Sequence, residues 1–123
     1  MLSKQWMMIG ATSAFFGVVL GAFGGHVLKN TLSEKAFSIY QVGIQYHMIH
    51  ALALIGLGLW SGQNTMVDTQ LPGWAFTFGI MVFSGSLYAL SLTDLKFLGM
   101  LTPLGGVSFL VGWSGFAWLA WKN

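Results

Sequence analysis

Four long apolar stretches, almost free of charged side chains, dominate this sequence. Each has about 20 residues, and a helix of that length spans about 30 Å, the thickness of the hydrocarbon core of a bilayer. A chain that crosses lipid must form helices or a closed barrel, and these stretches are too long and too continuously apolar for barrel strands. The predicted fold class is therefore all-α: an integral membrane protein, an antiparallel bundle of four transmembrane helices. We expect the spans to run from about Trp6 to Gly25, Val42 to Trp60, Gly73 to Leu92 and Pro103 to Trp121.

The composition excludes several other classes of protein. Only 7% of the 123 residues are charged, against about 25% in a soluble domain, and 55% are hydrophobic. The net charge of +2 is too small for a phosphate-binding surface, so we expect no nucleic-acid partner. The absence of cysteine excludes disulfides, thiolate metal ligands and cysteine nucleophiles. We expect a single four-helix transmembrane domain over residues 1–123.

Local signals place the helix boundaries. Thr31 and Glu34 have the spacing of a capping box, so we expect the second helix to begin near Leu32, well before its apolar stretch. Pro103 suits the first turn of the fourth helix, where a missing N–H costs nothing, and Thr102 would be its N-cap. The first apolar run is longer than the core of a signal peptide, so we interpret it as a retained helix.

Aromatic residues separate between the two ends of the predicted bundle. We call the end that holds both termini side A and the other end side B. Tryptophan and tyrosine anchor helices at both membrane interfaces, which supports the four-span register. Lysine is nearly balanced, two residues against three, and does not set the orientation. The residues concerned are Trp6, Trp60, Trp74, Trp118 and Trp121 at side A, and Tyr40, Tyr46 and Tyr88 toward side B.

Small residues form a stripe on the first helix and another on the fourth. Steps of three and four residues keep them on one helical face. Helices in lipid associate through close packing of small residues, so we expect these positions to be helix-packing sites. The alternative is a groove for a lipid or quinone tail. Because four short helices have more small faces than they can bury, we also expect a homo-oligomer. The stripes contain Gly10, Ala14, Gly17, Gly21 and Gly24, and Gly105, Ser108, Gly112 and Gly115.

Polar side chains gather in the side-B half of the predicted bundle. On the second helix, Tyr40, His47 and His50 share a face, and His50 lies about 12 Å inside the hydrocarbon. Ionisable residues at such depth are costly and often mark pathways or ligand sites. We select as candidate ligand or polar-cluster residues His26, Tyr40, Tyr46, His47, His50, Ser84, Ser86, Tyr88, Asp94 and Thr102.

Two interpretations of this cluster compete. In one, the histidines relay protons or line a ligand pocket, because imidazole titrates near neutrality. In the other, neutral histidines are hydrogen-bonded to Tyr, Ser or carbonyl groups and hold the helices together. A metal shared by His47 and His50 needs a third ligand from His26 or Asp94, so we expect no metal site. No motif fits a nucleophile elbow or a phosphate loop, and we assign no catalytic residue and no cofactor.

Several short motifs resemble one known family. They are GAFGGH at 21–26, Tyr46 followed by HALAL at 50–54, FSGSLY at 83–88, TPLGG at 102–106 and Gly112-Trp113. In this order and spacing, over nearly the whole chain, they resemble the YgdD-like family of small membrane proteins, a domain-of-unknown-function family with eukaryotic relatives. The resemblance implies four spans in a bacterial inner membrane, cytoplasmic termini and no established activity. The matching positions are His26, Tyr46, His50, Ser84, Ser86, Tyr88, Thr102 and Pro103.

The chain departs from that family at two positions. Gly25 stands where relatives often carry Ala, and His47 stands where they often carry Gln, so a two-histidine metal site is not implied. Our leading hypothesis is a non-enzymatic membrane protein that acts through helix packing and association with itself, membrane lipids or a membrane-protein partner. The alternative is a small transporter or proton-linked carrier of a hydrophobic ligand, and the third is a lipid- or quinone-handling enzyme. A wet cavity at His50 favours the second, and a dry, fully paired cluster favours the first.

Overall fold

The computed structural model describes residues 2–123, and four membrane-length helical rods make up almost all of this part of the chain. The first rod joins α1, η1 and α2, and the second rod is α3. The third rod joins α4, η2 and α5, and the fourth joins η3 and α6. The predicted all-α fold with four apolar spans is confirmed, and residues 2–123 contain no strand. The elements are α1 Leu2–Val18, η1 Val19–Gly24, α2 Gly25–Leu28, α3 Glu34–Gln63, α4 Gln70–Gly79, η2 Ile80–Ser84, α5 Gly85–Thr93, η3 Lys96–Met100 and α6 Thr102–Lys122.

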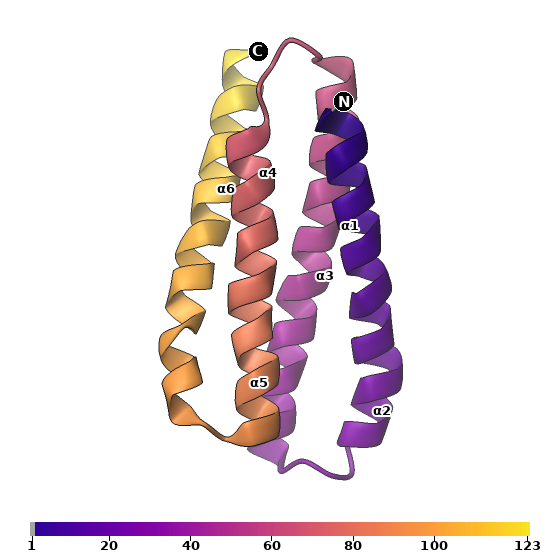
Figure 1. The fold of residues 1–123 in the computed structure, drawn as a ribbon, viewed down its shortest axis with the longest axis vertical. Coiled ribbons are helices and arrows are strands. Elements are labelled where there is room, and N and C mark those ends of the chain that lie inside the picture. Colours follow the sequence, from indigo (N-terminus) through magenta and orange to yellow (C-terminus); the bar gives the residue numbers. More distant parts are fainter. Residues whose placement is uncertain (1) are drawn as a thin grey trace.

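The rods run antiparallel, and both ends of the chain lie at one end of the bundle, side A (Figure 1). The most extensive packing joins α1 to α3, followed by α4 to α6 and α5 to α3. The rods that contain α1 and α6 lie at opposite edges of the view, with α3 and α4 between them (Figure 1). The second and third rods therefore carry most of the helix-to-helix packing.

An apolar core runs between the rods, while large apolar side chains also cover the outside. The core contains Trp6, Leu54, Leu57 and Phe76, each fully buried. Outward-facing side chains such as Met8 and Met81 are about 70% exposed, which suits a surface surrounded by acyl chains rather than water. The outer surface therefore agrees with a bundle embedded in lipid.

The small-residue stripes lie where rods approach each other most closely. A Cβ atom added at Gly10 would lie 2.8 Å from the carbonyl oxygen of Ala51, and one at Gly112 would lie 2.6 Å from the ring of Phe76. The hydroxyl of Ser108, in the stripe of the fourth helix, donates to the carbonyl oxygen of Ala75 at 2.7 Å. The bundle thus uses these faces internally, so the two stripes by themselves do not indicate a second copy.

Two of the predicted helix starts need correction. The helix α3 begins at Glu34 rather than Leu32, because the Ser33 hydroxyl is the cap and accepts from the N–H of Ala36 at 3.1 Å. Thr31 instead donates to the carbonyl oxygen of Val27. Thr102 is the first residue of α6 rather than its N-cap, since its hydroxyl bonds to Ser86. The helix α3 has 30 residues and begins before the apolar stretch at Val42, which confirms the prediction that it is longer than that stretch.

Two glycine substitutions test the close packing of the rods. A Cβ at Gly105 would lie 2.7 Å from Cα of Phe83, a backbone atom that cannot move alone, whereas a Cβ at Gly56 meets nothing within 4 Å. Gly105→Ala should lower the free energy of unfolding by about 1–3 kcal/mol through overpacking. Gly56→Ala should leave it unchanged or raise it by up to about 1 kcal/mol, because alanine favours helix. Reversible unfolding in mixed micelles measures both, and equal effects would contradict this packing.

Candidate functional site

His47 joins the first, second and third rods. Its Nε2 lies 2.8 Å from the carbonyl oxygen of Ser13, which accepts only, so Nε2 carries the hydrogen and donates. Its Nδ1 lies 2.7 Å from the hydroxyl of Tyr88 and therefore accepts from it. A larger residue at Gly43 would meet the Tyr88 ring, at 2.8 Å for an added Cβ. With a neutral imidazole, both ring nitrogens are used in this arrangement.

Tyr40 and Ser84 add two further bonds from side chains to neighbouring backbone. The Tyr40 hydroxyl donates to the carbonyl oxygen of Leu20, and the Ser84 hydroxyl donates to that of Gly43 at 2.7 Å. Leu20 lies within η1 and Ser84 ends η2, and both elements are wide π-helical turns. Such turns leave the regular hydrogen-bond ladder and are frequent at functional sites. No sequence signal pointed to either turn.

His50 forms a separate junction with the fourth rod. Its Nδ1 lies 2.7 Å from the carbonyl oxygen of Tyr46, so Nδ1 carries the hydrogen. Its Nε2 then accepts from the indole N–H of Trp113 at 3.0 Å. The ring stacks on Phe109 with centroids 3.5 Å apart. Trp113 was not predicted as a partner, although it belongs to the Gly112-Trp113 motif.

The other predicted members lie around these junctions or away from them. Ser86 and Thr102 share a hydrogen bond of 2.6 Å between the third and fourth rods. The Tyr46 ring, 39% exposed, packs 4.7 Å from that of Phe83. His26 and Asp94 are exposed and lie outside the two histidine junctions. Eight of the ten candidates therefore take part in several separate junctions rather than in one cluster, and His26 and Asp94 do not.

His47 and His50 do not share a ligand position. His47 turns to Ser13 and Tyr88, whereas His50 turns to Trp113. Across the described part of the chain, no three His, Asp or Glu side chains lie close enough together to hold a metal ion. Within residues 2–123, every buried side-chain nitrogen or oxygen has a hydrogen-bond partner in the protein. The buried polar side chains are therefore hydrogen-bonded within the protein, to other side chains or to backbone carbonyl oxygens.

A second set of buried, hydrogen-bonded polar side chains lies at side A, outside the side-B half in which the predicted polar residues gather. Trp6 is fully buried rather than an interfacial anchor, and its indole N–H donates to the Thr69 hydroxyl at 2.9 Å. Thr69 in turn lies 3.5 Å from the hydroxyl of Ser61. Because Gly73 has no side chain, it leaves the space that the Trp6 indole occupies. This group links the first rod to the loop between α3 and α4.

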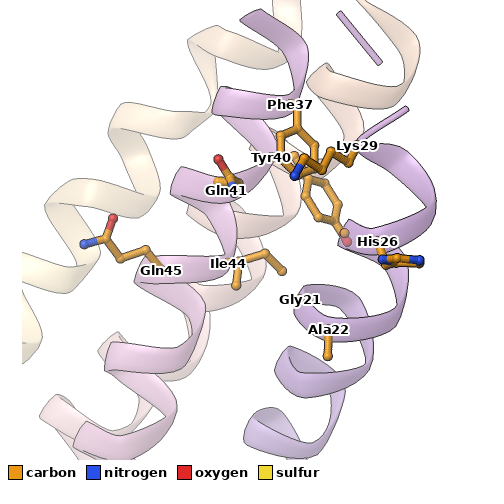
Figure 2. A pocket seen from close by; sticks show the side chains of 10 residues that line it. Gly21, Ala22, His26, Lys29, Phe37, Tyr40, Gln41, Ile44 and Gln45 are labelled. Carbon is orange, nitrogen blue, oxygen red and sulfur yellow. The ribbon is translucent and has the colours of Figure 1, made fainter. Parts of the chain in front are cut away.

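A hollow of about 440 Å³ opens at side B between α2 and the start of α3. Figure 2 shows Lys29 reaching across from the end of α2 toward α3, with Phe37 and Gln41 beside it. His26 lies on the first rod and points away from α3 in this view. Gly21 and Ala22 form the wall on the first rod, and Tyr40 lies at the back. The sequence analysis selected His26 and Tyr40 here but missed Lys29 and Gln41.

The fold and the lipid-facing surface define a four-span integral membrane protein. Comparison with known proteins then gives the family. A family model described as "Protein of unknown function (DUF423)" matches residues 20–106, and the chain belongs to this family. No solved structure matches the chain.

Relatives with printed names agree with this assignment. The chain is 46% identical over 110 residues to a UPF0382 membrane protein of Staphylococcus epidermidis, covering 89% of each chain. It is 40% identical over 111 residues to the UPF0382 membrane protein YwdK of Bacillus subtilis, covering 89% of this chain and 90% of that one. It is 38% identical over 114 residues to the UPF0382 inner membrane protein YgdD of Escherichia coli K12, covering 93% and 87%. The resemblance to the YgdD-like family is therefore confirmed.

The two histidines should carry their hydrogens on different nitrogens. From their partners, we expect Nε2–H in His47 and Nδ1–H in His50, measured by ¹⁵N NMR of histidine-labelled protein in lipid. Trp113→Phe removes the indole donor, so it should shift the His50 Nε2 signal toward that of a free acceptor and leave His47 unchanged. Trp118→Phe, a substitution at an exposed tryptophan, is the matched control. The same tautomer in both rings would contradict the assignment.

Proposed function

We propose that this protein is a non-enzymatic membrane protein that acts by association within the bilayer, with lipids, a membrane-protein partner or itself. The observation that supports this is the complete internal pairing of the buried polar side chains in residues 2–123. A pocket that binds a polar ligand offers it donors or acceptors that the protein itself does not use. Here His47, His50, Ser84 and Tyr88 use theirs between rods, as interhelical bonds do in packed membrane bundles.

One observation favours the alternative, a proton-linked carrier. Both partners of His47 are oxygen atoms, the Ser13 carbonyl and the Tyr88 hydroxyl. A hydroxyl both donates and accepts, so Tyr88 can turn its hydrogen away and accept an added N–H from His47. The indole of Trp113 only donates, so His50 cannot gain a hydrogen on Nε2 without losing that bond. A proton path would therefore pass through His47 and not through His50.

Purified protein in liposomes separates the two functions. For an association module, we expect vesicles with protein to keep an imposed pH gradient as long as protein-free vesicles, followed with an enclosed pH-sensitive dye. His50→Leu should change neither this result nor the fold, and should cost only about 0.6–1.7 kcal/mol of stability, the range for interhelical hydrogen bonds in membranes. A gradient that collapses with wild-type protein and persists with His47→Gln would establish the carrier instead.

We further propose that both termini face the cytoplasm. The termini share one end of the bundle, the E. coli relative is named an inner membrane protein, and the resemblance to the YgdD-like family implies that this end is cytoplasmic. A fluorescent protein that folds only in the cytoplasm, fused after Asn123, should therefore fluoresce in cells. The matched control inserts the same protein in the α2–α3 loop after Asn30, at side B, where it should stay dark. The opposite pattern would reverse the orientation. Homo-oligomer formation stays part of the proposal, without the support of the small-residue stripes.

A further inference from the structure

The side-B hollow combines a cation, amide groups and an apolar wall in one place. Lys29 supplies the cation, and Gln41 and Gln45 supply amides on exposed turns of α3. Gly21, Ala22 and Ile44 supply the apolar surface between the rods. Among the described residues that line the hollow, none is acidic. Its chemistry therefore suits a ligand that is anionic at one end and apolar at the other.

The position of the hollow points to the same kind of ligand. Its apolar wall belongs to the end of the first apolar stretch, and Lys29 follows directly after α2 ends at Leu28. A lysine just beyond a span lies at the level of the lipid phosphates, where it attracts anionic lipids. Because Gly21 and Ala22 of the first rod are small, they leave space in the hollow for an acyl chain beside Ile44.

We propose that this hollow binds an anionic phospholipid, with the phosphate at Lys29, the glycerol ester groups near Gln41 and Gln45, and an acyl chain along Gly21 and Ala22. The proposal deepens the proposed function, on which it rests, by naming the class of lipid. Tyr40 forms a rigid back wall because its hydroxyl is already bonded to Leu20. Glu34 lines an adjoining hollow, which Lys29 and Gln41 also line, and does not line the hollow proposed here.

Native mass spectrometry of the intact protein with phosphatidylglycerol and phosphatidylcholine tests the proposal. We expect wild-type protein to retain phosphatidylglycerol preferentially. Lys29→Gln should weaken this retention about fivefold, equivalent to roughly 1 kcal/mol for one lysine near the surface. The matched control is Lys96→Gln, which removes the same charge at side B but lines another hollow with Asp94. Its effect should be less than twofold.

A second pair of variants tests the cavity without changing charge. Ala22→Leu should fill the wall of the hollow and reduce retention of phosphatidylglycerol, whereas Ala11→Leu, at another exposed position of the first rod, should not. Equal losses with Lys29→Gln and Lys96→Gln would show a general surface charge and overturn the site. No preference over phosphatidylcholine, or unchanged binding with Ala22→Leu, would also overturn it. Because the liposome experiment does not depend on this hollow, failure here leaves the association function intact.

Discussion

Every polar group of this protein that lies in the hydrocarbon must find its partner within the protein, and the rest of the structure depends on that constraint. The helix α3 makes most of the hydrogen bonds that join one rod to another in the side-B half. Three of its side chains bond to other rods: Tyr40 and His47 to backbone carbonyls of the first, and His50 to the indole of the fourth. Its own carbonyl at Gly43 accepts from Ser84 on the third rod. The central position of α3 thus follows from its polar residues as much as from its apolar ones.

Close approach of the rods is what makes these bonds reachable. A side chain can reach a carbonyl on another helix only where small residues let the backbones come near. Gly24 faces the Tyr40 hydroxyl, and Gly17 faces Met48 and the His47 ring, at the two places where α3 bonds to the first rod. The glycine stripe and the polar face of α3 are therefore two parts of one interface. This explains why the stripe of the first rod is used inside the bundle.

Much of the architecture was predictable because it follows from average properties of long segments. Span length, apolar content and the shared side of the termini need no knowledge of neighbours, and all four spans appear in the structure. Pairings were not predictable, since they depend on how the rods rotate about their axes. The spacing of His47 and His50 put them on one face, yet they turn to different rods. Ser33 caps α3, whereas the hydroxyl of Thr31 donates to the carbonyl oxygen of Val27. The carbonyl oxygens of Ser13 and Leu20 could not be predicted as partners, because any residue has such an oxygen.

Tyr40 is the residue at which the hydrogen-bonded interior and the side-B hollow meet. Its ring lines the hollow, its hydroxyl is bonded to Leu20, and it lies 5.3 Å from the Tyr88 ring, centroid to centroid. Tyr88 in turn donates to His47, so the chain of contacts runs from the hollow to the first rod. Because these contacts already hold Tyr40 in place, its side chain loses little conformational entropy when a ligand binds, which favours binding. The buried bonds that hold the rods together thus also give the hollow its preformed shape.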